Sequence, residues 1–154
     1  ALIDNSDYER VSKFKWQVKL SPNGRSYAYR NQWLPRNKIY LHRFIMDAPV
    51  GVFVDHQDRN GLNCQRYNLR LCTNSQNASN SKIPSTNKSG FKGVSFEKKR
   101  GKWRSDIVLN KPSHFLGYFD TAEDAARAYD EKAIELFGEF ARINGIAESG
   151  GSSD

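Results

Sequence analysis

Alternating apolar and polar residues in the first part of the chain predict short β-strands. The alternation covers residues 14–20 and 26–30, and the five residues between them, 21–25, include proline and an Asn-Gly pair. Such a cluster favours a tight turn, so this region predicts a β-hairpin. Residues 40–46 instead have apolar side chains at helical spacing and precede a proline, which predicts a brief helix.

The next segment predicts a strand, a loop, a second strand and a helix. Residues 52–54 form a short apolar run, Asn60-Gly61 permits a tight turn, and residues 68–73 suit a return strand. Thr73 and Gln76 then have the spacing of a capping box, in which each side chain bonds the other residue's backbone. This pair predicts the start of a helix.

A polar segment separates this region from the last part of the chain. Residues 78–90 contain almost no large apolar side chains, so they cannot bury enough surface to form a packed element. We therefore predict a first domain over 1–78, an extended linker over 79–90, a second domain over 91–145 and a tail over 146–154.

The second domain shows three strand patterns followed by one helix pattern. The strands are predicted over 92–96, 102–109 and 113–119, and the helix begins at Thr121 and ends near Gly138. Small and apolar residues recur every three or four positions in that helix, which predicts close packing against a sheet. Its acidic residues, Glu123, Asp130, Glu131 and Glu135, fall outside this stripe and are expected to face solvent. The fold class is therefore α+β in both domains.

Charge narrows the choice of partner. The chain carries 24 Lys and Arg against 17 Asp and Glu, and a basic balance of this size makes nucleic acid a natural partner. Between Lys88 and Lys111 there are eight basic residues and two acidic ones. No apolar run approaches the length of a membrane span and no signal sequence opens the chain, so we expect a soluble, cytoplasmic protein of a bacterial or phage-infected cell. Cys64 and Cys72 are expected as free thiols.

Four polar side chains in the strand-loop-strand-helix segment suggest chemistry. Asp55 and His56 end the first strand, Asn68 begins the second, and Asn77 lies in the helix. A carboxylate and an amide oxygen can hold a divalent ion at a phosphodiester, while a neighbouring imidazole takes a proton from water. The ordinary alternative is a polar loop in which Asp55 caps a turn.

Residues 55–80, with DH, NLR and QN in that order, resemble the HNH nuclease family and its ββα-metal fold. The resemblance implies that Asp55 is a metal ligand, His56 the general base, and Asn68 the residue that braces the loop. Asn77 stands where many members have histidine, as in the HNN variants of phage nicking enzymes. Amide and carboxylate oxygens suit Mg²⁺, or Mn²⁺, and no zinc is expected.

Residues 91–144, through FKGVSF, GKWRSDI, FLGYFDTAEDAARAYDEKA and FGEFARIN, resemble the AP2 DNA-binding domain. The family places its three-stranded sheet in the major groove of DNA and backs the sheet with a helix. The side chains that remain able to contact DNA are Lys92, Lys102, Trp103 and Arg104. Ser95, Glu97 and Ser113 instead stand where plant members commonly have arginine. The target sequence of those members therefore does not transfer.

The order HNH then AP2 resembles homing endonucleases of phages and bacteria. We therefore predict a monomeric enzyme that nicks double-stranded DNA. The residues expected to contact DNA are Arg43, Arg66, Arg70, Lys88, Lys92, Lys98, Lys99, Arg100, Lys102, Trp103 and Arg104.

Two alternative functions of the chain and the roles of two residues remain open at this stage. The chain could be a DNA-binding regulator with an inactive nuclease unit, or an RNA-binding protein that uses the same basic surface. His42 suits either contact with the scissile phosphate or a structural hydrogen bond, and Trp103 suits either the sheet's core or DNA.

Overall fold

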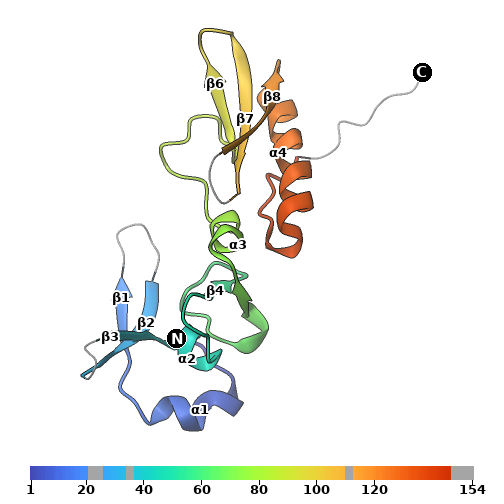
Figure 1. The fold of residues 1–154 in the computed structure, drawn as a ribbon. Helices are drawn as coiled ribbons and strands as arrows, with labels where there is room; N and C mark the ends of the chain where they lie inside the picture. Colours follow the sequence, from blue (N-terminus) through green and yellow to red (C-terminus); the bar gives the residue numbers. More distant parts are fainter. Residues whose placement is uncertain (21–25, 34–36, 110–112, 147–154) are drawn as a thin grey trace. The chain divides into compact units, whose positions relative to one another are not determined.

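The computed structural model describes residues 1–20, 26–33, 37–109 and 113–146. The chain divides into two units, Ala1–Asn80 and Ser81–Asp154, and both combine helices with antiparallel sheets (Figure 1). The predicted turn at 21–25, most of the turn at 109–112 and nearly all of the tail lie outside the described residues. No helix in the described part of the chain has the length and apolar character needed to cross a bilayer.

A three-stranded sheet and two helices make up the first half of unit 1. Strands β1 (Gln17–Leu20), β2 (Ser26–Gln32) and β3 (Asn37–Tyr40) pair antiparallel in that order. Helix α1 (Asn5–Ser12) precedes the sheet and α2 (Leu41–Ile45) follows it. The antiparallel pairing of β1 with β2 confirms the predicted hairpin strands, and α2 confirms the brief helix.

Neither α1 nor β3 was predicted from the sequence. Helix α1 has the sequence NSDYERVS, with only two apolar residues, and it is held by tertiary contacts instead. Val11 enters the core, and the buried Asp7 pairs with Arg66 at 2.7 and 2.8 Å. Strand β3 has four residues and too short a pattern to recognise; its register with β2 defines it.

The second half of unit 1 confirms the predicted strand-loop-strand-helix order. Strands β4 (Phe53–His56) and β5 (Leu69–Cys72) pair antiparallel, with a short 3₁₀ turn (Arg66–Asn68) before β5. Helix α3 (Asn74–Ser79) begins with the predicted capping box: Gln76 N–H donates to Thr73 Oγ1 and Thr73 N–H donates to Gln76 Oε1. The core beneath these elements contains Val11, Ala28, Leu41, Ile45, Val54, Cys64 and Leu69.

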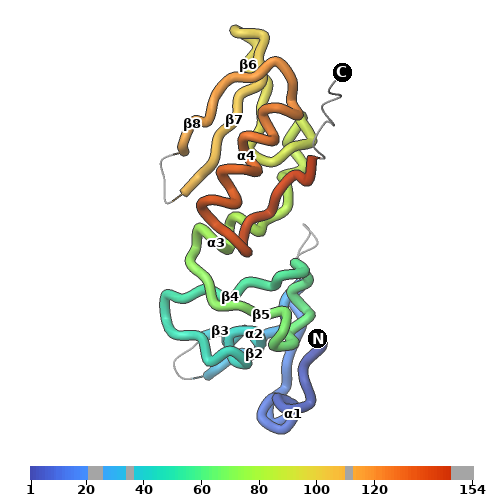
Figure 2. The backbone as a smooth tube through the Cα atoms, turned by 90° about the vertical axis from the view of Figure 1, so that its right-hand side faces the viewer, coloured from blue at the N-terminus to red at the C-terminus, as the bar shows by residue number. Residues whose placement is uncertain are grey.

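Unit 2 is a three-stranded sheet with one helix on one of its faces. Strands β6 (Val94–Glu97), β7 (Lys102–Val108) and β8 (Ser113–Phe119) pair antiparallel in that order. Helix α4 (Ala122–Phe137) runs along the sheet and a 3₁₀ turn (Gly138–Phe140) follows it (Figures 1 and 2). The predicted stripe of small residues is the packed face, since Ala125, Ala126 and Ala133 are fully buried. Gly138, at φ +51°, ends the helix as predicted.

The prediction that Asp130 faces solvent is wrong. Its carboxylate is buried and accepts hydrogen bonds from the backbone and side-chain amides of Asn144 at 2.7 and 2.8 Å, and from Gly145 N–H at 3.1 Å. Asn144 Oδ1 in turn accepts from Lys92 N–H. Asp130 therefore anchors the chain after α4 to the start of the sheet, a tertiary role that helical periodicity does not reveal.

The predicted domain boundaries remain a prediction, but the polar segment has structure of its own. Ser89 Oγ bonds the carbonyl oxygens of Phe91 and Val94, and Lys92 Nζ donates to the carbonyl of Ser81. The contacts divide the chain directly after Asn80. Residues 81–90 thus belong to unit 2 by their contacts.

Two glycines in unit 2 offer a test of its packing. Gly93 has φ +75°, and a Cβ there would lie 2.0 Å from the Tyr129 ring and 2.6 Å from the carbonyl oxygen of Asp106. Gly90 has nearly the same φ, +79°, with nothing within 4 Å. We expect Gly93→Ala to destabilise unit 2 by about 1–3 kcal/mol more than Gly90→Ala, because overpacking adds to the same backbone strain.

Hydrogen exchange of β6–β8 during urea titration measures this difference. Exchange in β4 and β5 serves as the internal reference, because those strands belong to unit 1. Equal destabilisation by the two substitutions would contradict the assigned close approach of Gly93 to α4.

Candidate active site

The antiparallel pairing of β4 with β5 separates the two candidate residues Asp55 and His56. Asp55 lies opposite Arg70, and His56 lies opposite Leu69. Because successive side chains of a strand point to opposite faces, Asp55 shares a face with Arg70 while His56 faces the core side with Leu69. Both residues are buried, and they are the last two residues of β4.

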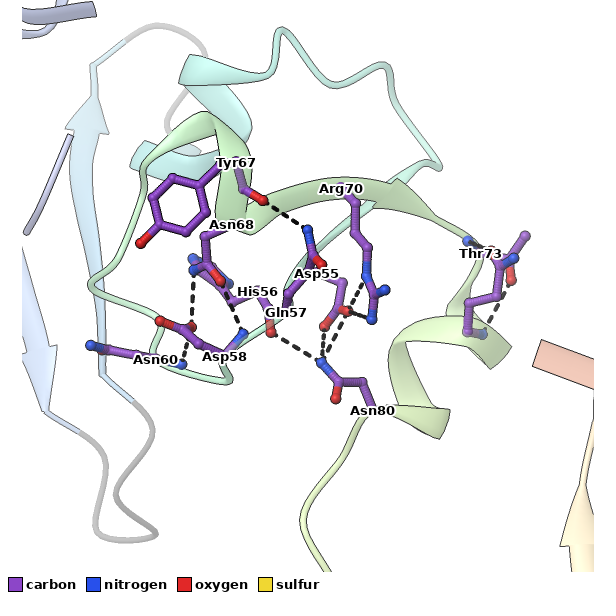
Figure 3. Close-up of polar contacts among 11 residues, drawn as sticks. Asp55, His56, Gln57, Asp58, Asn60, Tyr67, Asn68, Arg70, Thr73 and Asn80 are labelled. Carbon is purple, nitrogen blue, oxygen red and sulfur yellow. Dashed lines mark hydrogen bonds and ion pairs between the residues drawn. The ribbon is translucent and has the colours of Figure 1, made fainter. Parts of the chain in front are cut away.

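The carboxylate of Asp55 is buried and held from two directions. Arg70 donates from Nε and Nη2 to Oδ2 at 2.9 and 2.8 Å, and Asn80 Nδ2 lies 3.0 Å from each carboxylate oxygen (Figure 3). The same amide also donates to the carbonyl oxygen of His56 at 3.0 Å. A buried carboxylate requires this compensation, because an unpaired buried charge is costly.

Asn80 is a site residue that the sequence prediction did not include. It follows α3 directly and keeps the helical backbone conformation, so it lies three residues after the predicted metal ligand Asn77. Residues three apart share a helix face, which places Asn77 one turn from the amide that touches Asp55. The three-residue spacing of Asn77 and Asn80 was the sequence signal that could have identified Asn80.

His56 is enclosed by side chains from other parts of unit 1. Its Nε2 lies 4.0 Å from Cys64 Sγ, and its ring centroid lies 4.9 Å from that of His42 and 5.9 Å from that of Tyr27. Burial lowers the pKa of His56, and the nearby Asp55 and Asp58 oppose this shift. The neutral imidazole, which is the form a general base needs, is therefore favoured.

Asn68 uses its whole side-chain amide to brace the loop between β4 and β5. Its Nδ2 donates to Asp58 Oδ1 at 2.9 Å, and its Oδ1 accepts from Asp58 N–H at 2.9 Å (Figure 3). The same Nδ2 also donates to the carbonyl of Asn63 at 2.8 Å. Asp58 also accepts from Asn60 N–H and Asn63 Nδ2. These hydrogen bonds keep the pKa of Asp58 below its usual value against the effect of burial.

Three arginines of unit 1 that were predicted to contact DNA have partners within the protein. Arg43 donates to the carbonyl oxygens of Ala48, Pro49 and Val52. Arg66 pairs with Asp7 and also donates to the carbonyl of Ile45, and Arg70 pairs with Asp55. Their contact with DNA stays a prediction, and any such contact has to coexist with these bonds or replace them.

The basic residues of unit 2 fall into two groups. Lys88, Lys98, Lys99 and Arg100 are exposed, the last three in the turn between β6 and β7. Lys102 pairs with Asp120, and Arg104 pairs with Asp106 through Nε and Nη2 at 2.6 and 2.7 Å. Lys92 bonds Ser81, and Trp103 packs against the core cluster beneath α4.

Metal-binding groups are sparse in the described residues. Within 1–20, 26–33, 37–109 and 113–146 no group of three or more His, Cys, Asp and Glu side chains is placed to hold an ion. Asp55 offers hard carboxylate oxygens, and helix α3, which contains Asn77, contacts the strand of Asp55. Mg²⁺ is commonly bound by one or two carboxylates together with water and substrate phosphate, so this small set fits that ion.

Comparison with known proteins identifies the class. A family model described as HNH endonuclease matches residues 40–79. The chain is 36% identical over 152 residues to "Uncharacterized HNH endonuclease L560" of Acanthamoeba polyphaga mimivirus, covering 95% of this chain and 75% of that protein. It is 39% identical over 95 residues to Protein 3.8 of Escherichia phage T7, covering 62% of this chain and 78% of that protein.

The chain therefore belongs to the HNH endonuclease family. It is also 44% identical over 61 residues to APETALA2-like protein 2 of rice, covering 40% of this chain and 14% of that protein. No solved structure matches the chain. The resemblances to HNH nucleases and AP2 domains are confirmed, and so is the α+β architecture that they imply.

Asn68 provides a test of the loop brace. We expect Asn68→Ala to lower the free energy of unfolding by about 1–3 kcal/mol, because it removes three hydrogen bonds to Asp58 and Asn63 and leaves the buried carbonyl of Asn63 without this partner. Urea denaturation measures the change, with the exposed Asn31→Ala as the matched control. Equal stability of the two variants would contradict the bracing role.

Proposed function

We propose that this protein is a Mg²⁺-dependent, homing-type DNA endonuclease that acts as a monomer and nicks one strand of a duplex. One observation carries the proposal: Asn80, at the end of α3, holds both oxygens of Asp55 on β4 at 3.0 Å. This contact brings the helix that contains Asn77 to the end of the strand that contains Asp55 and His56. Mn²⁺ is the expected substitute for Mg²⁺.

In this proposal His56 is the general base. It takes a proton from the water that attacks phosphorus in line with the departing 3′ oxygen, which leaves 5′-phosphate and 3′-hydroxyl ends. Asp55 and Asn77 would hold the ion, and Asn68 keeps the loop in place. A bound divalent ion stabilises negative charge on the phosphate and the leaving oxygen.

Arg70 has a part in the proposal because it already neutralises Asp55. Its guanidinium lies 2.8 Å from the carboxylate oxygen that the ion would approach, and like charges repel. A DNA phosphate offers the guanidinium an alternative bidentate partner. In this proposal Arg70 therefore exchanges its ion pair with Asp55 for the predicted contact with phosphate.

For unit 2 we propose that the AP2-like domain supplies DNA recognition. The exposed turn of Lys98, Lys99 and Arg100 is the strongest local attraction for phosphate on the sheet side. Lys102 has a carboxylate partner in Asp120, directly after β8, and Arg104 has one in Asp106 on β7, so both would contribute less to long-range attraction.

The catalytic prediction concerns His56. We expect His56→Ala to abolish nicking of supercoiled plasmid in Mg²⁺ while duplex binding persists, because the base is lost and the binding surfaces are not. His114→Ala is the matched control, since His114 lies in β8 of unit 2 and is exposed. EDTA should abolish plasmid nicking by the unmodified protein.

The result also decides between this function and a regulator with an inactive nuclease unit. A protein that binds duplex but leaves plasmid intact at every Mg²⁺ or Mn²⁺ concentration would favour the regulator. Equal loss of cleavage and binding in His56→Ala would contradict the role assigned to His56.

The binding prediction concerns the turn between β6 and β7. We expect Lys98→Ala/Lys99→Ala to weaken duplex binding similarly for every sequence, and to reduce the slope of log affinity against log salt by about 2, since each phosphate contact contributes about 1. Fluorescence anisotropy at several salt concentrations measures both quantities. Lys132→Ala, on acidic helix α4 and paired with Glu135, should leave them near the unmodified values. An unchanged slope in the double variant would remove this turn from the DNA interface.

A further inference from the structure

The imidazole of His56 is packed against rings that lie outside the residues assigned to catalysis. His42, in α2, meets the His56 ring edge to face, with centroids 4.9 Å apart and planes at 76°. Tyr27, in β2, lies 5.9 Å from His56 and 5.6 Å from His42. Tyr40 stacks on the other imidazole, His42, at 5.6 Å and 26°. Rings from the N-terminal sheet and α2 thus surround the proposed base.

His42 has no polar partner for one of its ring nitrogens. Its Nδ1 is buried and makes no hydrogen bond within the part of the chain that the structure describes. Burial, together with the nearby His56 and Arg43, lowers the pKa of His42 to about 3, so the ring is neutral near pH 7. A neutral ring without a bond at Nδ1 acts on its neighbour through packing and shape. The structural hydrogen bond considered for His42 is therefore absent at Nδ1 in the described residues.

Gly61 permits the approach of Tyr27 to this site. A Cβ at position 61 would lie 2.3 Å from the carbonyl oxygen of Ser26 and 2.6 Å from two atoms of the Tyr27 ring. Glycine thus lets β2 come close to the loop that joins β4 and β5. The same loop carries Cys64, whose Sγ lies 4.0 Å from Nε2 of His56.

We propose that His42 and Tyr27 are positioning residues that fix the orientation of the His56 imidazole through ring packing, so that the N-terminal sheet and α2 form part of the active site. This inference rests on the proposed role of His56 as base. A general base must be held in a narrow orientation, because its nitrogen has to point at the proton it removes. The hydrogen bonds of β4 fix the backbone of His56, and the rings fix its side chain.

Paired substitutions at His42 separate ring packing from other roles. His42→Ala removes the ring, and we expect kcat for nicking to fall at least about tenfold with little change in KM, because a misplaced base slows chemistry and not binding. His42→Phe restores a ring of similar shape without nitrogens and should recover kcat to within about threefold of the unmodified enzyme. Tyr8→Leu, which removes an exposed ring in α1, is the control for losing an aromatic side chain.

A spectroscopic readout tests the same inference without cleavage. In ¹H–¹⁵N spectra of the histidine rings, His42→Ala should shift and broaden the His56 ring signals, and His42→Phe should keep them sharp. Tyr27→Leu should broaden them as well, which provides a second variant if His42→Ala does not fold. Failure of His42→Phe to recover kcat would overturn the packing role, and so would unchanged His56 signals in both His42→Ala and Tyr27→Leu.

The two proposals fail in different ways. If the unmodified protein does not cleave DNA, the proposed function fails, but the ring signals still show whether His42 and Tyr27 hold His56. If the unmodified protein cleaves and His42→Ala cleaves equally fast, the proposed function stands and the positioning role fails.

Discussion

The buried carboxylate of Asp55 is the constraint on which the nuclease unit depends. A charge in this position is tolerated only with partners at hydrogen-bonding distance, and those partners come from two different elements, Arg70 on β5 and Asn80 after α3. Satisfying one side chain therefore fixes the strand pair and also the end of the short helix. Helix α3 has six residues, too few to be stable alone, so this contact and the capping box at Thr73 decide where it lies.

The same strand serves a second purpose on its other face. Because side chains alternate along β4, Asp55 faces its charged and amide partners while His56 faces the aromatic rings. The polar contacts and the aromatic packing therefore do not compete for space. The loop between β4 and β5 is then held by Asn68 and Asp58, which bond each other across it. Two adjacent residues at the end of one strand therefore have very different surroundings.

Local patterns were sufficient for much of this architecture. The capping box at Thr73 and Gln76, the small-residue stripe of α4 and the three strands of unit 2 all depend on spacing within a few residues, and the structure has them. What the sequence did not reveal depends on contacts between distant residues. Helix α1 needs Arg66 to pair with Asp7, and Asn80 becomes a site residue only because the return of the chain brings it to Asp55. The burial of Asp130 likewise requires Asn144, which is 14 residues away.

The basic stretch from Lys88 to Lys111 shows why counting charges is a poor guide to a binding face. The stretch contains eight basic residues and two acidic ones. However, Arg104 donates from both Nε and Nη2 to Asp106, and Lys102 pairs with Asp120, which lies outside the stretch. Pairing across and along the sheet removes much of the field that these cations would project. The field of the sheet then depends on its turn, where Lys98, Lys99 and Arg100 are exposed, and Arg100 also lies over the ring of Tyr118. In the proposed function, attraction to phosphate and contact with bases would therefore come from different parts of the same small sheet. The exposed turn would attract the backbone of the duplex, and the strands would have to exchange their internal ion pairs before they contact bases.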